Sequence, residues 1–127
     1  MTEEKSGFSG SDATSIEGRV WIARDLHQKV PQLDNGDFLL IEDNDLTQPD
    51  AELLIESGAR VVINAQLSVT GRVRSRGPQV LLDAGIVLID DCGPDVWALK
   101  DGDTVRIVGS EIQSKGKRIA QGNRYDS

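Results

Sequence analysis

The chain of 127 residues is long enough for one domain with a packed core and too short for two. Apolar residues make up 38% and aromatic residues only 4%, so the predicted core is aliphatic. The net charge of −7 argues against nucleic acid as a partner, because phosphate backbones require a basic face. The single cysteine, Cys92, excludes an internal disulfide and a cysteine-cluster zinc site.

The two ends of the chain differ in composition from the part between them. Residues 1–15 lack an apolar segment, which predicts a disordered leader and not a signal peptide. Residues 16–122 form the predicted single domain, and residues 123–127 a tail or a linker to a missing domain. No apolar run reaches the ~20 residues that span a bilayer. We therefore expect a cytoplasmic protein whose residues make no direct membrane contact.

The first predicted element is a short strand over residues 19–24. Residues 24–33 have apolar side chains at helical intervals, although Pro31 weakens that pattern. The Asn35-Gly36 pair indicates a turn, and residues 37–42 are predicted to form a buried strand.

Three helix–strand units follow. In the first, Thr47 is the predicted N-cap of a helix that ends at Gly58. Proline stands just inside each helix start and glycine just past each end, which is the usual asymmetry. The predicted helices and strands after Gly58 are, in chain order, strand 60–65, helix 79–84, strand 86–90, helix 95–100, strand 104–109 and strand 117–122.

This alternation predicts an α/β fold with a mostly parallel sheet covered by helices. The strand at 117–122 is predicted to pair with residues 104–113 through the turn at Lys115-Gly116. That pairing is antiparallel, so the predicted sheet is mixed.

Positive charge is concentrated in one loop of this acidic chain, between strand 60–65 and helix 79–84. Arg72, Arg74 and Arg76 alternate there with small residues, and Gly77-Pro78 opens the helix. The guanidinium group of arginine and the free N–H groups at the start of a helix both bind phosphate or carboxylate oxygens. The candidate anion-binding residues of this loop are Ser68, Thr70, Gly71, Arg72, Arg74, Arg76 and Gly77. Alternatively, the arginines are solvated charges that prevent sheet-edge association.

Acidic and amide side chains follow three of the predicted strands. Asp90 and Asp91 are weak candidates for a magnesium ion; the alternative is that one caps the next helix while the other faces solvent. Residues 43–45 either complete a pocket with Arg72 or serve as turn and cap residues. Asn64 is expected to fix a neighbouring loop by hydrogen bonds.

Several short motifs occur together and in order. They are Val62-Ile63-Asn64-Ala65, then Ser68, Thr70, Gly71 and Arg72, then Gly77-Pro78, Ala84-Gly85-Ile86 and Asp90-Asp91-Cys92-Gly93-Pro94. Through these motifs, residues 37–122 resemble the N-terminal domain of the SteA family of cytokinetic ring proteins from actinobacteria. The resemblance implies a cell-division role. In that family the domain precedes a thiamine pyrophosphokinase-like domain and a membrane-anchored C-terminus, so any kinase-like activity lies outside these residues.

The order of the elements is also similar to the swivelling β/β/α domain of phosphoenolpyruvate-utilising enzymes. In those domains the loop before the equivalent helix holds a phosphorylated histidine. Here that region is Ser75-Arg76-Gly77-Pro78, and the only histidine, His27, lies far upstream. The resemblance therefore implies the fold. The absence of a histidine from this loop excludes the phosphohistidine relay.

Two classes of function remain open. The first is a non-catalytic interaction or regulatory domain of a SteA-like protein, whose partner is another protein or a second copy. The second is a small-ligand domain that binds a phosphorylated metabolite or nucleotide and forms part of an active site with the missing domain. No catalytic residue and no cofactor is predicted, because no Walker loop, dinucleotide fingerprint or Ser/His/Asp set is present.

Overall fold

The computed structural model describes residues 15–28, 30–34, 36–71 and 75–126. Its strands and helices alternate from β3 to residue 98, and the remaining strands follow one another. The elements are β2 (Ser15–Ala23), β3 (Phe38–Ile41), α1 (Gln48–Ser57), β4 (Val61–Asn64), α2 (Gly77–Asp83), β5 (Val87–Asp90), the 3-10 helix η2 (Pro94–Ala98), β6 (Thr104–Val108), β7 (Glu111–Ser114), β8 (Lys117–Gln121) and β9 (Asn123–Arg124).

These strands form one eight-stranded sheet in the order β8-β7-β6-β2-β3-β4-β5-β9. Strands β2 to β5 are parallel neighbours, and the other pairings are antiparallel. The long strand β2 joins the two halves, because residues 15–19 pair with β6 and residues 20–23 pair with β3. The predicted mixed α/β sheet is confirmed, and its antiparallel share is larger than the sequence indicated.

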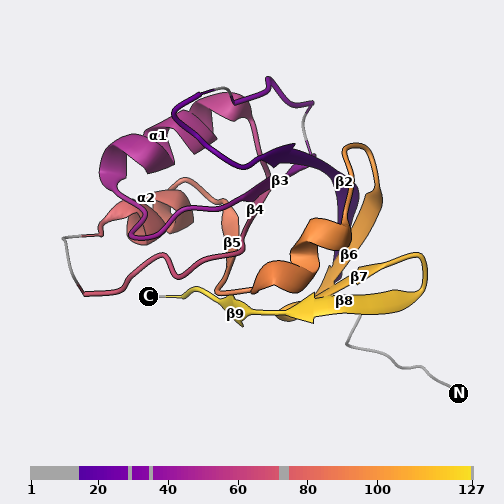
Figure 1. The fold of residues 1–127 in the computed structure, drawn as a ribbon. Coiled ribbons are helices and arrows are strands. Elements are labelled where there is room, and N and C mark those ends of the chain that lie inside the picture. Colours follow the sequence, from indigo (N-terminus) through magenta and orange to yellow (C-terminus); the bar gives the residue numbers. More distant parts are fainter. Residues whose placement is uncertain (1–14, 29, 35, 72–74, 127) are drawn as a thin grey trace, which may run out of the picture.

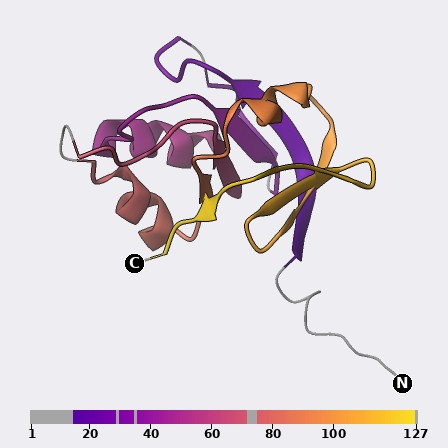
Figure 2. The ribbon, with the colours of Figure 1, turned by 60° about the horizontal axis from the view of Figure 1, so that its bottom comes forward.

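Different elements pack against the two faces of the parallel part of the sheet (Figure 1). Helices α1 and α2 lie on one face, where Leu54 and Leu81 pack with Leu39 and Val62 in one core cluster. On the other face, η2 and strands β6–β8 complete a second cluster around Phe38. Figure 2 shows the same separation, with the helices on one side of the parallel strands and the β6–β8 strands on the other.

Helix α1 begins and ends with the predicted capping residues, Thr47 and Gly58. Thr47 Oγ1 accepts a hydrogen bond from the Asp50 N–H at 3.3 Å, and Gly58 adopts the left-handed conformation at φ 87°. Both features supply partners for backbone groups that have none inside the helix. The predicted start and end of this helix are confirmed.

Other elements differ from the predictions. Residues 24–33 form no helix in their described part, and the Asp25 carboxylate instead accepts from the His27 N–H at 2.9 Å in a local turn. The helix predicted at 95–100 is the shorter 3-10 helix η2. The antiparallel region contains a separate strand β7, and β9 in the predicted tail pairs with β5.

Candidate functional site

The loop between β4 and α2 (residues 65–76, the β4–α2 loop) is tied to the carboxyl end of β5. Ser68 is fully buried, and its N–H and hydroxyl donate to Asp90 Oδ1 at 3.0 and 2.6 Å. Burial raises the pKa of Asp90, and the hydrogen bonds from Ser68 oppose that effect. Ser68 is therefore an internal anchor of the loop.

A second anchor ties the same loop to the segment after β3. The N–H and hydroxyl of Thr70 both donate to Asp45 Oδ1 at 2.7 Å, and Ser75 Oγ donates to the same oxygen at 3.2 Å. Gly71 follows at φ 89°, a conformation that glycine adopts without strain. Asp45 thus lies beside the described part of this loop, as the shared strand edge predicts, whereas the expected pocket with Arg72 falls outside the described residues.

Asn64 connects the two anchored segments at the end of β4. Its Nδ2 donates to Ser68 Oγ at 2.7 Å and to the Asp43 carbonyl at 2.8 Å, while its Oδ1 accepts from the Asp43 N–H at 3.0 Å. The side chain is fully buried, so each of these groups needs a protein partner. The expectation that Asn64 fixes a neighbouring loop is confirmed.

The start of α2 is closed by backbone contacts. The Gly77 N–H donates to the Leu46 carbonyl at 3.0 Å, and an added Cβ would lie 2.6 Å from the carbonyl oxygens of Leu46 and Thr47. Gly77 therefore permits two backbone segments to approach. Arg76 is exposed beside it, whereas Arg72 and Arg74 lie outside the described residues.

The structure brings Ser68 and Thr70 to one edge of the sheet, but their donors face the protein's own carboxylates. The residues on either side of Ser68 turn apolar side chains outward. Leu67 is 38% exposed and Val69 is 46% exposed, and these two are the exposed large hydrophobic residues in the described part of the chain. The anchored loop therefore presents an apolar surface.

The two acidic residues at the end of β5, Asp90 and Asp91, lie in different environments. Asp90 is buried against Ser68, while Asp91 is exposed at φ 54°. The expected helix cap is wrong, because Gly93 is the N-cap of η2 and no side chain caps that helix. Within the described residues, no group of three or more His, Cys, Asp or Glu side chains is arranged to hold a metal ion.

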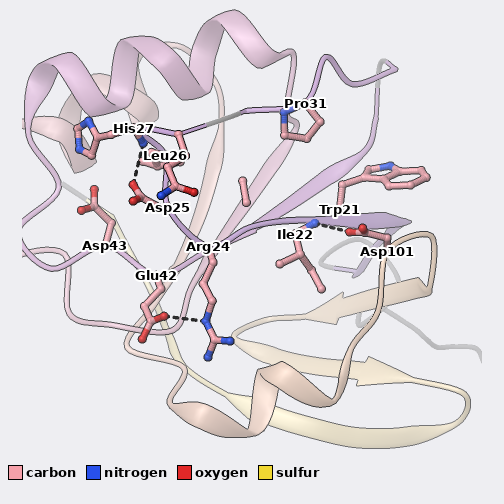
Figure 3. Close-up of a pocket in the computed structure, with 12 residues that line it drawn as sticks. Trp21, Ile22, Arg24, Asp25, Leu26, His27, Pro31, Glu42, Asp43 and Asp101 are labelled. Atoms are coloured by element: carbon pink, nitrogen blue, oxygen red, sulfur yellow. Dashed lines mark hydrogen bonds and ion pairs between the residues drawn. The ribbon is translucent and has the colours of Figure 1, made fainter.

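A cavity of about 770 Å³ lies at the carboxyl ends of β2 and β3, and we call it the β2–β3 cavity (Figure 3). Its volume falls within the range of roughly 300–1,000 Å³ that is usual for small-molecule sites. Apolar and acidic side chains line it together with two basic ones. The lining residues are Trp21, Ile22, Ala23, Arg24, Asp25, Leu26, His27, Gln28, Pro31, Glu42, Asp43 and Asp101.

Arg24 is held at one wall of this cavity. Its Nε donates to Glu42 Oε1 at 2.9 Å (Figure 3). Its guanidinium also lies 4.1 Å from the centroid of the Trp97 ring. The hydrogen bond from Arg24, with a second from Gln66, lowers the pKa of Glu42. The positive charge is therefore balanced by Glu42 and oriented by the aromatic ring.

Asp43 also lines the cavity, and it is influenced by Asp50, which is not a lining residue. Asp43 is half-buried after β3, and Asp50 is buried in the first turn of α1. Burial, and next a hydrogen bond with Asp50, raise the pKa of Asp43 to about 7. His27 Nε2 lies 3.3 Å from Asp50 Oδ1.

Sequence reasoning missed this cavity. Arg24 and His27 follow β2, Asp43 follows β3 and Asp50 lies in α1, so no local motif contains them. The available signal was the strand edge: polar residues directly after parallel strands meet there. The polar residues after β3, β4 and β5 are predicted from this signal, and the residues after β2 carry the same signal.

Comparisons with known proteins support the fold. No family model matches the chain, and neither does any curated protein. Within the described residues, no helix is both long and apolar enough to cross a membrane. Among solved structures, the chain is similar to 3-isopropylmalate dehydratase (leuD) from Methanocaldococcus jannaschii, with a TM-score of 0.57 and 16% identity over 89% of this chain and 84% of that one. The α/β fold of this chain is thus similar to the swivelling β/β/α fold of leuD.

Proposed function

We propose that the chain is a non-catalytic interaction domain of a SteA-like, cell-division-associated protein, and that the β4–α2 loop contacts another protein. The observation that carries this proposal is the exposure of Leu67 and Val69 on a loop in which Ser68 and Thr70 are anchored. Exposed apolar side chains on a fixed frame are typical of protein contact surfaces.

The anchors give the loop a physical advantage in binding. Ser68 is tied to Asp90, and Thr70 is tied to Asp45, on either side of Val69. A loop that is ordered before binding loses less conformational entropy when a partner docks. The motif residues that support the SteA resemblance therefore have a structural task, which is to hold the loop in place.

The positive charge of the β4–α2 loop supports the proposal that its partner is a protein with an acidic surface. The sequence places Arg72 and Arg74 directly after Gly71, and Arg76 is exposed at the start of α2. Basic side chains beside an apolar contact raise the association rate and fix its orientation. The chain's own charge of −7 makes a second copy one partner of this kind.

Site-specific photo-crosslinking tests the proposal. A photoreactive residue at position 67, introduced in the host cell, should give discrete crosslinked products, and mass spectrometry should separate self-crosslinks from another protein. Leu53 is the matched control position, because it is a half-exposed leucine on α1 outside the loop. Equal crosslinking at positions 67 and 53 would contradict the proposal.

The volume of the β2–β3 cavity supports a second candidate function, the binding of a small ligand such as a phosphorylated metabolite or nucleotide, although four carboxyl groups line it (Asp25, Glu42, Asp43 and Asp101). A screen of nucleotides, thiamine phosphates and sugar phosphates by thermal shift tests it. Loss of a positive shift in Arg24→Gln would assign the ligand to the cavity, and loss in Arg76→Gln would assign it to the β4–α2 loop. The absence of any shift would overturn this candidate.

A further inference from the structure

The charged groups that line the β2–β3 cavity are unequal in number. Four carboxyl groups and two basic side chains line it, namely Asp25, Glu42, Asp43, Asp101, Arg24 and His27. Both basic side chains already have acidic partners, because Arg24 pairs with Glu42 at 2.9 Å and His27 Nε2 lies 3.3 Å from Asp50. Asp25 and Asp101 have no ion-pair partner among the residues that the structure describes. The cavity therefore has an excess of negative charge, which favours a ligand with a positive group.

Arg24 nevertheless offers a carboxylate site on one side of this cavity (Figure 3). Its Nε donates to Glu42, and its guanidinium lies 4.1 Å from the centroid of the Trp97 ring, so the group is oriented. Its two terminal nitrogens have no hydrogen-bond partner in the described part of the chain. A guanidinium held in this way can donate two parallel hydrogen bonds to a carboxylate.

Asp25 offers an ammonium site on the side of the cavity where His27 lies (Figure 3). Its Oδ1 accepts a hydrogen bond from the His27 N–H at 2.9 Å, which fixes the carboxyl group. Its Oδ2 has no hydrogen-bond partner among the described residues, so it can accept from an ammonium group. Asp43 also lines the cavity, and burial raises its pKa to about 7. A bound ammonium group would favour the charged form of Asp43 and so gain a second negative neighbour.

Apolar side chains supply much of the remaining lining. They are Trp21, Ile22, Ala23, Leu26 and Pro31. Figure 3 shows Trp21, Ile22 and Pro31 on the side of the cavity away from Glu42 and Asp43. Leu26 and Ala23 are each only 4% exposed and belong to the core cluster under α1, so this part of the lining is fixed. The cavity of about 770 Å³ therefore has room for apolar side chains beside two charged groups.

We infer that the β2–β3 cavity binds a zwitterion, an apolar amino acid or short peptide whose carboxylate contacts Arg24 and whose ammonium group contacts Asp25. This inference rests on the second candidate function, the binding of a small ligand in the cavity, and names the charge type of that ligand. A zwitterion satisfies the guanidinium and the carboxyl group together. A phosphate dianion would satisfy Arg24 alone and would be repelled by Asp25 and Asp101.

NMR titration of the unsubstituted chain tests the ligand class without any variant. The signal of the Trp21 indole N–H reports on the cavity, because Trp21 lines it. The probes are the dipeptide L-leucyl-L-leucine and two compounds that each carry one of its charges, isovalerate and isoamylamine. The dipeptide should bind at least about tenfold more tightly than either single-charge compound, because both of its charged groups find a partner.

Two substitutions assign the charged groups of the ligand to their sites. Asp25→Asn keeps an acceptor for the His27 N–H and removes the charge, so it should weaken binding of the dipeptide and of isoamylamine about tenfold, but not binding of isovalerate. Arg24→Gln should weaken binding of the dipeptide and of isovalerate about tenfold, but not binding of isoamylamine. The matched controls are Asp83→Asn and Arg60→Gln, which make the same changes at exposed positions outside the cavity and should leave all three affinities unchanged.

The outcomes separate this inference from the candidate function on which it rests. Dipeptide binding that is no tighter than that of the single-charge compounds, or that weakens equally in Asp25→Asn and Asp83→Asn, would overturn the zwitterion site. If inorganic phosphate or a nucleotide shifts the Trp21 signal and the dipeptide does not, the cavity binds a small ligand and the inferred ligand class is wrong. If none of these compounds shifts the signal, the inference and the candidate function both fail.

Discussion

Ser68 donates its backbone N–H and its hydroxyl to one oxygen of Asp90, at 3.0 and 2.6 Å, in the interior of the protein. This pair ties the loop after β4 to the end of the neighbouring strand β5. The side chains on either side of Ser68, Leu67 and Val69, are consequently held at the surface.

Removal of the Ser68 hydroxyl should destabilise the fold more than removal of the Thr70 hydroxyl. Ser68→Ala leaves buried acceptor capacity on Asp90 and an unpaired Asn64 donor, which costs about 1–3 kcal/mol. Thr70 is exposed, so water replaces its hydroxyl and the expected cost of Thr70→Ala is below about 1 kcal/mol. Urea unfolding of both variants measures the difference, and equal costs would contradict the role of Ser68 as the buried anchor.

Gly77→Ala should destabilise the protein through steric overlap. The new Cβ would lie 2.6 Å from the Leu46 and Thr47 carbonyl oxygens, and both are backbone atoms that cannot rotate away. The expected cost is roughly 1–3 kcal/mol. Gly85→Ala is the comparison, because Gly85 has open space and a φ of 83°, so it should cost only about 1 kcal/mol of backbone strain. Thermal unfolding of the two variants separates these effects.

The free energy of unfolding should depend on pH because Asp43 ionises. Its folded pKa of about 7 lies above the ordinary 3.8, so the folded state binds the proton more tightly than the unfolded state. The resulting stability is fully present below about pH 4 and is lost as the pH rises through 7. Because the group is only half-buried, solvent screening reduces the loss to about 1–2 kcal/mol.

Asp43→Asn removes this ionisation. Relative to the unsubstituted chain, the variant should gain free energy of unfolding at pH 8 and show little difference at pH 4. Denaturant unfolding across this pH range gives the comparison, with Asp83→Asn as the control for a change of net charge. Parallel curves for Asp43→Asn and the unsubstituted chain would show that Asp43 does not titrate in this window.

Arg24→Gln should raise the pKa of Glu42 toward its usual value of 4.5, since the hydrogen bond from Arg24 is the largest cause of its depression. Gln66→Ala should produce a smaller rise, because Gln66 is the second cause. NMR titration of the Glu42 carboxyl carbon measures both shifts. An unchanged midpoint in Arg24→Gln would mean that the ion pair is not formed in solution.

The sequence predicted those features that depend on neighbouring residues. The α1 caps at Thr47 and Gly58 and the strands β3, β4 and β5 follow from local composition and spacing. The helix predicted at 24–33 is wrong for a similarly local reason: Asp25 captures the His27 N–H, and Pro31 offers no N–H to continue a helix.

The sequence could not predict contacts that the sheet order creates. Parallel pairing of β2 with β3 brings Arg24 beside Glu42, and the packing of α1 on the sheet brings Asp50 beside His27, although no shared motif links these residues. The sequence predicts the hydroxyls of Ser68 and Thr70 as donors to a bound anion, and the structure places Asp90 and Asp45 against them. Such partners become visible only once the strand ends are placed side by side.

The most direct test of the interaction proposal combines crosslinking with loss of the anchor. A photoreactive residue at position 67 should give a discrete crosslinked product in the host cell. Its yield should fall several-fold when Ser68→Ala is added, provided that the variant remains folded by circular dichroism, because a released loop loses more entropy on docking. A yield that is unchanged by Ser68→Ala, or no product above that at position 53, would contradict a preordered contact surface at this loop.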